Sequence, residues 1–154
     1  MRDVAAESYE IVRGTLGALR SSTTPFLSSL LNERSSLIVK QGNFKYTFQE
    51  EGQPCPLPPL VLHNSYYIYK EAINNINKHS EAQNVEGKLV WGSHDLTIVI
   101  KDDGKGFFSG LLNSEGHYGL DIMRERAELI HGRLDIQSQI GKGTLLTIWI
   151  PLNQ

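Results

Sequence analysis

The chain has 154 residues, enough for one domain with a sizeable hydrophobic core. Hydrophobic residues make up 40% and charged residues 21%, as in ordinary soluble globular proteins, and no apolar run approaches the roughly 20 residues that span a bilayer. A net charge of −2 without a basic run gives no electrostatic reason to expect nucleic acid, and the single cysteine, Cys55, excludes internal disulfides and cysteine metal clusters.

Two helices are predicted before residue 40. A loose apolar stripe between Val4 and Arg20, ended by a Ser/Thr run and Pro25, predicts a short helix that is marginal alone. The next stretch, Phe26–Val39, offers an apolar face typical of a second helix. A half-buried strand should follow, because the aromatic residues at 44, 46 and 48 alternate with polar ones.

A third, longer helix is predicted from Pro59 to about His79, after a proline-rich loop. Its apolar residues recur at spacings of three and four and therefore share one face. These residues are Leu62, Tyr66, Tyr69, Ile73 and Ile76. Glu71, Asn75 and Lys78 are then expected on the opposite face, where they suit a metal ion, phosphate oxygens and a proton acceptor. Taken alone, these three residues are more simply a solvated polar face.

The second half of the chain predicts two hairpins with a helix between them. Residues 85–91 and 96–102 are strands joined by a turn, and residues 134–140 and 144–150 form a closing hairpin. The glycine-rich stretch 103–119 predicts a mobile loop before a helix that ends at a capping glycine, Gly132. The whole predicts a two-layer α/β sandwich, with a mixed or antiparallel sheet of about five strands and helices over one face.

Two polar residues lie at strand ends on the side that faces the core. Asp102 continues the alternation of three apolar residues, and Thr144 begins a similar series. A buried carboxylate without a partner is costly, so Asp102 needs a donor, and the exocyclic amine of an adenine would serve. Thr144 could help through a water molecule, although a simple turn residue is an equal alternative for it.

Two glycine-rich motifs surround the predicted loop. DDGKG begins at Asp102, and its glycines let backbone approach a ligand. GHYGL begins at Gly116 and leads into a helix whose first N–H groups suit phosphate. Each motif alone is more simply a β-turn or a linker. Their order and spacing, together with the helix that ends near His79, favour an ATP site.

The motifs EAINNINKH, DDGKGF, GHYGLDIMRERA and GKGT, in this order, resemble the N, G1 and G2 boxes and the terminal glycine–threonine of the GHKL (Bergerat-fold) ATPases. The longer stretch GHYGLDIMRERAELIHGRL is similar to sensor histidine kinases of the nitrate-sensor and lipid-desaturase-thermosensor type. The resemblance covers residues 25–152. It implies a Bergerat-type mixed sheet of about five strands, with helices on one face and a glycine-rich ATP lid.

The resemblance also implies roles for individual residues. Asn75 supplies an oxygen to Mg²⁺, and Glu71 is the acid of the N box and the catalytic residue. Asp102 recognises adenine with the help of Thr144. The other ATP-binding residues that the resemblance implies are Lys78, His79, Gly104, Lys105, Gly106, Tyr118, Gly119 and Leu120.

The phosphoacceptor histidine of these kinases has no match here, because His63, the first histidine, already lies in the helix of the predicted ATP site. Residues 1–24 resemble the end of the second dimerisation-hairpin helix with its linker, and residues 25–154 resemble the catalytic ATPase domain. The implied activity is transfer of the γ-phosphoryl group of Mg-ATP to a histidine on the dimerisation domain of the same kinase. A response regulator with a helix-turn-helix output domain would then receive the phosphoryl group.

The cellular setting follows from the same observations. We expect a cytoplasmic protein, or the cytoplasmic part of a membrane-bound sensor, without direct contacts to nucleic acid or membrane. An anti-sigma-type serine kinase on the same fold and a non-catalytic nucleotide-binding docking module are the alternatives. Acid-labile phosphate on a supplied hairpin would favour the histidine kinase, whereas acid-stable phosphoserine would favour the serine kinase. Phosphoryl transfer of either kind would exclude the docking module.

Overall fold

The computed structural model describes residues 26–108 and 118–152. The elements in these ranges are α2 (Leu27–Val39), β1 (Lys45–Glu51), α3 (Pro59–Asn75), the π-helical turn η1 (Ile76–Ser80), β2 (Asn84–Trp91), β3 (Asp95–Asp102), α4 (Tyr118–Leu129), β4 (Arg133–Gln139) and β5 (Gly143–Pro151). The helix predicted before Pro25, and residues 109–117 of the predicted loop, lie outside the described residues.

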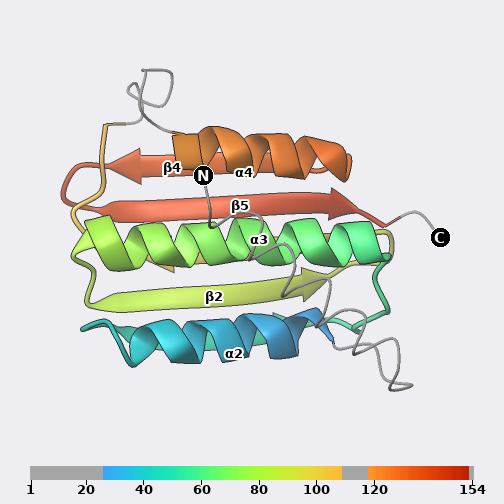
Figure 1. Cartoon of the computed structure of the whole chain (residues 1–154), viewed down its shortest axis with the longest axis horizontal. Coiled ribbons are helices and arrows are strands. Elements are labelled where there is room, and N and C mark those ends of the chain that lie inside the picture. The colour runs from blue at the N-terminus through green and yellow to red at the C-terminus, as the bar shows by residue number, and fades with distance from the viewer. Residues whose placement is uncertain (1–25, 109–117, 153–154) are drawn as a thin grey trace, which may run out of the picture.

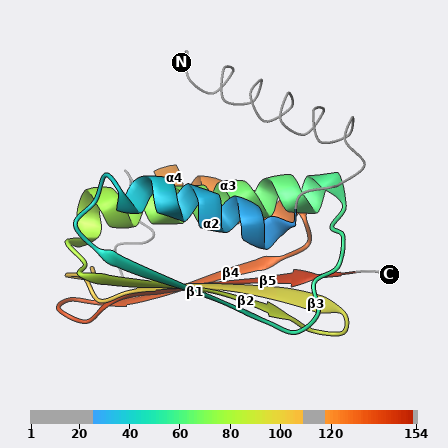
Figure 2. The ribbon, with the colours of Figure 1, turned by 90° about the horizontal axis from the view of Figure 1, so that it is seen from below.

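The described elements form two layers. The five strands make one sheet in the order β1-β2-β3-β5-β4, in which β1 is parallel to β2 and the other neighbours are antiparallel. All three described helices cover the same face of this sheet (Figure 2). In Figure 1, α3 lies over the middle of the sheet, with α2 on one side of it and α4 on the other. The predicted two-layer sandwich with a mixed sheet is confirmed.

The core lies between the sheet and α3. Strands β2, β3 and β5 bury every second side chain, because one face of each strand is turned toward the helices. From the other side, α3 contributes buried Ile68, Tyr69 and Ile73, which are fully shielded from solvent. Burying each side chain of this size contributes about 1.5–3 kcal/mol, so the core fixes the height of α3 above the sheet.

A buried hydroxyl cluster fixes α3 sideways. The Tyr69 hydroxyl on α3 lies 2.9 Å from Ser35 Oγ on α2 and is hydrogen-bonded to the Tyr46 hydroxyl on β1. Gly87 on β2 makes room for this cluster, since a Cβ there would lie only 2.5 Å from the Tyr46 hydroxyl and 2.9 Å from that of Tyr69. Because buried hydroxyl groups must keep their partners, the cluster limits the sliding of α3 over the sheet.

The end of α4 differs from the prediction. The left-handed residue is His131, with φ of 55°, and Gly132 follows it. The Gly132 N–H donates to the Ala127 carbonyl at 2.8 Å, and the His131 N–H donates to that of Glu128 at 2.9 Å, as in a Schellman motif. Gly132 is needed for space, since a Cβ would lie 2.8 Å from the Trp149 carbonyl oxygen.

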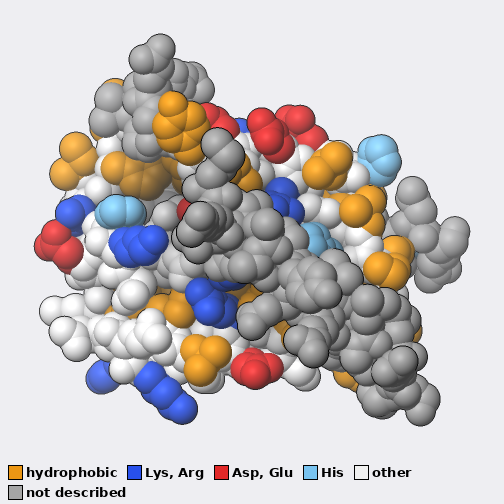
Figure 3. Space-filling view, viewed as in Figure 1, with side chains coloured by type: hydrophobic (Ala, Val, Ile, Leu, Met, Phe, Trp, Pro, Cys, Tyr) orange, Lys and Arg blue, Asp and Glu red, His pale blue; other side chains and the backbone are white. Residues whose placement is uncertain are grey.

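The surface of the helix side mixes charges of both signs. In Figure 3, the Lys and Arg side chains of the described residues are interspersed with Asp and Glu side chains rather than gathered into one stripe. Among the described helices, none is long and apolar enough to cross a membrane.

Candidate nucleotide-binding site

A cavity of about 540 Å³ lies between the helix layer and one end of the sheet, a size that suits a small-molecule ligand. It is lined from three directions: by α3 with η1, by the start of α4, and by the ends of β3 and β5 with the loop after β3. The predicted site residues on its wall are Glu71, Asn75, His79, Asp102, Lys105, Gly106, Tyr118, Gly119, Leu120 and Thr144. The structure thus brings together ten residues from four separate segments of the chain.

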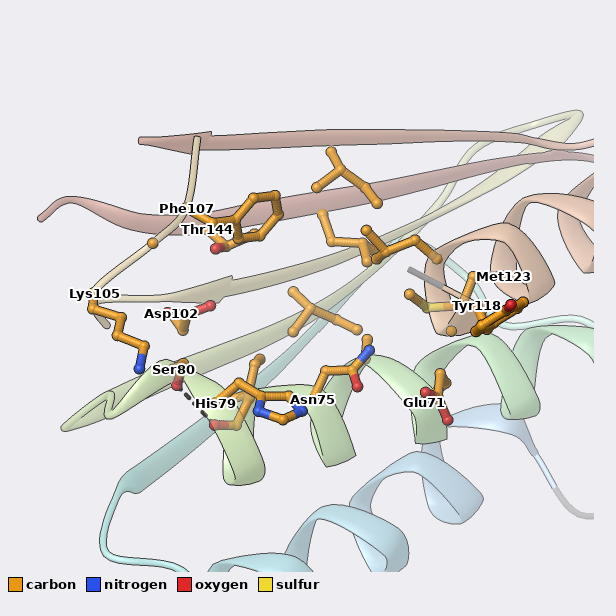
Figure 4. A pocket seen from close by; sticks show the side chains of 18 residues that line it. Glu71, Asn75, His79, Ser80, Asp102, Lys105, Phe107, Tyr118, Met123 and Thr144 are labelled. Carbon is orange, nitrogen blue, oxygen red and sulfur yellow. Dashed lines mark hydrogen bonds between the residues drawn. The ribbon is translucent and has the colours of Figure 1, made fainter. Parts of the chain in front are cut away.

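The helical wall carries three polar side chains at spacings of four, Glu71, Asn75 and His79. Figure 4 shows them in a line along the helix, from Glu71 near Tyr118 to His79 near Ser80. Apolar Ala72 and Ile76 also line the cavity, so the polar residues flank the apolar face of the helix. The prediction that Glu71 and Asn75 lie opposite that face together with Lys78 was wrong for these two residues, because α3 is packed by the sheet below and by a helix on each side.

Lys78 is not brought into the cavity. Its side chain is exposed, and it is absent from the cavity wall, whereas its neighbour His79 is present. Both residues lie in the π-helical turn η1, and successive side chains there point in different directions, which accounts for this difference.

The π-helical turn η1 shapes the end of this wall. The Ser80 hydroxyl donates to the Ile76 carbonyl at 2.8 Å and accepts the Ala82 N–H at 3.1 Å, and Glu81 then leaves the helix in the left-handed conformation. The freed Ser80 carbonyl accepts the Lys105 N–H at 2.7 Å. Such π-turns occur often at functional sites, and this one joins the helical wall to the loop after β3.

Asp102 is the buried carboxylate of the site. Only 3% of the residue is exposed, and its Oδ1 accepts the Gly104 N–H at 2.8 Å. Burial raises the pKa of Asp102, and backbone N–H groups of Gly104 and Thr144 partly offset that rise. Figure 4 shows the side chain directed into the cavity beside Thr144, so a ligand amine can reach it.

The rest of the DDGKG loop supports Asp102. Gly104 is not on the cavity wall, but a Cβ there would overlap the Ser80 carbonyl oxygen. The Asp103 carboxylate accepts the backbone N–H groups of Gln83 and Asn84, each at 2.8 Å. Hydrogen bonds from Asn84 side chain and backbone lower the pKa of Asp103, and therefore its charged form holds the loop against the start of β2.

Lys105 lines the cavity, but its ammonium group forms an ion pair with Glu81 at 2.8 Å. Both side chains are largely exposed, so the pair is weak and the ammonium can turn toward an anion in the cavity at little cost.

Gly143 holds the closing hairpin against the end of β3. Its φ is +82°, and a Cβ would overlap the Asp102 carbonyl oxygen. We expect Gly143→Ala to lower the free energy of unfolding by about 3 kcal/mol, because the backbone conformation and the contact both oppose it. Gly141→Ala is the matched control, since φ is +78° there but nothing lies within 4 Å, and it should cost about 1 kcal/mol. Equal losses in urea unfolding would show that the contact with Asp102 contributes nothing.

The third wall is the start of α4, where Tyr118, Gly119 and Leu120 lie. A Cβ on Gly119 would lie 2.6 Å from Glu71 Oε1 and 3.6 Å from Asn75 Nδ2. The glycine therefore lets the first turn of α4 approach the polar residues of α3. Unpaired N–H groups at a helix start favour anions such as phosphate, so this end of the cavity suits the phosphates and the Asp102 end suits the base.

Comparison with known proteins agrees with this arrangement. Residues 64–154 match the family described as "Histidine kinase-, DNA gyrase B-, and HSP90-like ATPase". The match covers more than half of the chain. The chain belongs to this ATPase family. ATP is therefore the ligand that family membership implies for the cavity.

This ATPase domain is similar to parts of sensor histidine kinases. It is 37% identical over 105 residues to the signal transduction histidine-protein kinase/phosphatase DegS of Brevibacillus brevis, covering 68% of this chain and 27% of DegS. It is 35% identical over 130 residues to the nitrate/nitrite sensor protein NarQ of Escherichia coli (strain K12), covering 79% of this chain and 22% of NarQ. The chain thus spans about a quarter of the length of these relatives.

A solved structure shows the same fold. The Erythrobacter litoralis EL346 blue-light activated histidine kinase matches with a TM-score of 0.71 at 23% identity, over 82% of this chain and 42% of that chain. The likeness supports the Bergerat-type sandwich that the motifs predict.

The donor set of the ATPase domain fits Mg²⁺ that arrives with a nucleotide. Within residues 26–108 and 118–152, no group of three His, Cys, Asp or Glu side chains could hold a metal ion. The Asn75 amide, beside the start of α4, can offer one oxygen. This suits Mg²⁺, which takes few protein ligands and keeps phosphate oxygens and waters.

Sequence reasoning missed several residues of the cavity wall. Ser80 and Phe107 line it, and so do Met123 and Ile136. Phe107 directly follows the DDGKG loop, so its position could have been recognised. Ser80 could not, because its place on the wall depends on the π-helical turn rather than on a regular helix.

Proposed function

We propose that this domain binds Mg-ATP and transfers the γ-phosphoryl group to a histidine on the dimerisation domain of a two-component sensor kinase. One observation carries the proposal: a single cavity holds a buried carboxylate for the purine at one end and an acid–amide pair beside a helix start at the other. The names of DegS and NarQ, a histidine kinase and a sensor protein, give this nucleotide site its biological context.

The purine end uses Asp102 as an acceptor for the adenine amine. Guanine and hypoxanthine carry a carbonyl oxygen at that position, which the ionised carboxylate would repel. Thr144 lies beside Asp102 on β5 and lines the same cavity, so its hydroxyl can bind the adjacent edge of the ring, directly or through water. Selection of adenine follows from these two side chains.

The phosphate end uses α3 and α4. Asn75 would hold Mg²⁺ through its amide oxygen, and the first N–H groups of α4 would face the phosphate oxygens. When bound, Mg²⁺ neutralises charge on the phosphates. Lys105 and His79 line the cavity near Ser80, at the end of the helical wall away from Glu71, where they can donate hydrogen bonds to the nucleotide. Lys78 would need a changed side-chain position to reach the cavity.

The transfer step needs positioning more than acid–base chemistry. A neutral imidazole nitrogen forms the new P–N bond, the bond between the γ-phosphorus and its bridging oxygen breaks, and ADP leaves with that electron pair. Glu71 lies in the cavity beside Gly119, where its carboxylate can accept the N–H of the acceptor imidazole and orient the ring. Glu71 is therefore the catalytic residue of the proposal.

The proposal assigns the remaining parts of the kinase by resemblance. Residues 1–24 would be the end of the dimerisation hairpin and its linker, and residues 25–154 the catalytic domain. The partners would be the histidine-bearing hairpin of the same kinase and a response regulator with a helix-turn-helix output domain. Such a domain would work in the cytoplasm, alone or as part of a membrane-bound sensor.

We expect Glu71→Gln to slow phosphoryl transfer to a supplied hairpin about a hundredfold, because the neutral amide orients the imidazole less strongly. ATP affinity should change less than about threefold. Single-turnover transfer and calorimetric titration measure the two effects. Glu86→Gln, an exposed acid on β2, is the control. Normal transfer with a collapse in ATP affinity would show that Glu71 serves nucleotide binding instead.

The stability of the transferred phosphate tests the proposed function as a whole. With a hairpin supplied, acid-labile phosphate that depends on Mg²⁺ is expected. Acid-stable phosphoserine on a protein substrate would favour an anti-sigma-type serine kinase, and binding without any transfer would favour a docking module. If ATP raises the melting temperature only when Mg²⁺ is present, the result would support nucleotide binding but would not test phosphoryl transfer.

A further inference from the structure

Three polar side chains form a row across neighbouring strands at the purine end of the cavity. Asp102 on β3 is registered opposite Thr144 on β5, and Thr144 is registered opposite Ser138 on β4. Asp102 and Thr144 line the cavity, but Ser138 does not. Ser138 Oγ lies 2.9 Å from Thr144 Oγ1 and so contacts the cavity-facing hydroxyl from behind.

Ser138 also joins two backbone segments around the cavity. Its Oγ accepts the N–H of Phe107, a cavity-lining residue, at 2.9 Å. The same oxygen lies 3.1 Å from the Gly143 carbonyl oxygen, to which it can donate. A serine hydroxyl has one proton and two lone pairs, and Phe107 occupies one of the lone pairs. One proton and one lone pair remain for Gly143 and Thr144.

This shortage makes the Thr144 hydroxyl depend on Ser138. If Ser138 donates to Gly143, its free lone pair accepts the Thr144 proton. Thr144 can then only accept a hydrogen bond from a ligand in the cavity. If Ser138 donates to Thr144, the Thr144 proton is free to point into the cavity. The polarity that a ligand meets at Thr144 is therefore set by the direction of the Ser138 proton.

An adenine ring that contacts Thr144 directly requires the second arrangement. Its exocyclic amine donates to Asp102, and the ring nitrogen beside the amine-bearing carbon is an acceptor. For direct contact a donor is needed there, and Thr144 is the neighbouring hydroxyl on the cavity wall. Ser138 can supply this pattern by donating to Thr144.

We propose that Ser138 is a positioning residue for purine recognition, whose hydroxyl directs the Thr144 proton toward the adenine ring nitrogen while holding the Phe107 backbone at the cavity. The proposal rests on the proposed ATP site. It extends the adenine-reading pair of Asp102 and Thr144 to a row of three residues, of which the third acts only through the second.

Ser138→Ala should change the binding affinities of two nucleotides that differ at one atom by different amounts. One is ATP, and the other is an ATP analogue in which the ring nitrogen beside the amine-bearing carbon is replaced by C–H. We expect the variant to bind ATP about fivefold to tenfold more weakly, the effect of one lost hydrogen bond. Affinity for the analogue should change less than about twofold, since the atom that the relay serves is already absent.

Two further variants test whether the effect passes through Thr144. Ser138→Thr keeps the hydroxyl and should restore ATP affinity to within about twofold of the unchanged chain. In a Thr144→Val background, adding Ser138→Ala should weaken ATP binding less than about twofold, because residues acting in series are not additive. Gln137→Ala, on the exposed face of β4, should leave both affinities unchanged.

The outcomes are distinct. Equal weakening for ATP and the analogue would overturn the proposal in favour of a purely structural role, and unchanged ATP affinity would overturn it outright. If Ser138→Ala lowers the melting temperature too far for titration, Ser138→Cys, which keeps a side chain of similar size with a weak donor, serves in the same comparison. Failure of the unchanged chain to bind either nucleotide would contradict the ATP site itself.

Discussion

Asp102→Asn should lower ATP affinity at least about a hundredfold, close to 3 kcal/mol, without unfolding the domain. The asparagine oxygen can keep the Gly104 N–H, which lies 2.8 Å from Oδ1 in the structure. The amide NH₂ would then face the adenine amine, and two donors would meet in a buried place. Calorimetric titration with Mg-ATP measures the loss.

The same substitution should leave the unliganded domain as stable as before, or more so. The pKa of Asp102 is raised mainly by burial, so the ionised carboxylate opposes folding at neutral pH. This cost is present above the raised pKa and disappears as the pH falls through it toward the ordinary Asp value. Any increase in the free energy of unfolding that Asp102→Asn gives in urea should therefore become smaller at lower pH.

Asp135→Asn is the matched control, because that carboxylate is exposed on β4 and contacts only Gln137 among the described hydrogen bonds. It should change neither ATP affinity nor stability measurably. If Asp102→Asn unfolded the domain, the main role of the Asp102 carboxylate would be to stabilise the fold rather than to bind the purine. If ATP bound with normal affinity, the assignment of the purine end would be wrong.

Asn75→Ala should remove the Mg²⁺-dependent part of ATP binding, a loss of about a hundredfold or roughly 3 kcal/mol. The amide lies beside the Glu71 carboxylate and the first turn of α4, where it can offer its oxygen to an ion that phosphates also bind. In the part of the chain that the structure describes, no group of three His, Cys, Asp or Glu side chains could hold the ion in its place. Parallel titrations with Mg²⁺ and with a chelator separate the two contributions.

Asn77→Ala is the control for this prediction. Asn77 lies two residues further along the helix, is exposed, and is not on the wall of the nucleotide cavity. Its removal should leave the Mg²⁺ effect unchanged. Equal Mg-ATP affinities for Asn75→Ala and the unchanged chain would refute the metal role, whereas equal losses with Mg²⁺ and with chelator would assign Asn75 to direct nucleotide contact.

The secondary structure could be predicted because each element carries its own periodic pattern. The strand ending in Asp102 alternates apolar and polar residues, and in the structure this alternation places Asp102 on the buried face. The pattern also indicated Thr144 on the same side of the neighbouring strand. The sequence predicted the hairpin that pairs β4 with β5, but it did not give the register that puts Ser138 behind Thr144.

The helical wall shows the limit of pattern reasoning. The spacing of apolar residues such as Leu62 and Ile73 identified an apolar face. The prediction assumed, however, that the helix packs against other elements on that face alone. In the structure α3 is packed by the sheet and by helices on both sides, so the cavity lies on its flank. This geometry brings His79 onto the wall and leaves Lys78 in solvent.

The sequence by itself determined which residue types are available and where helices, strands and turns form, because those depend on spacing, glycine and proline over a few neighbours. It also carried the order of motifs that indicates an ATPase. Only the tertiary structure decided which side of α3 faces the ligand, that the helix ends in a π-turn, and that Ser138 lies behind Thr144. The packing of α3 depends on contacts with segments far apart in the chain, and the place of Ser138 depends on the register of the β4–β5 hairpin, which the periodic pattern does not fix.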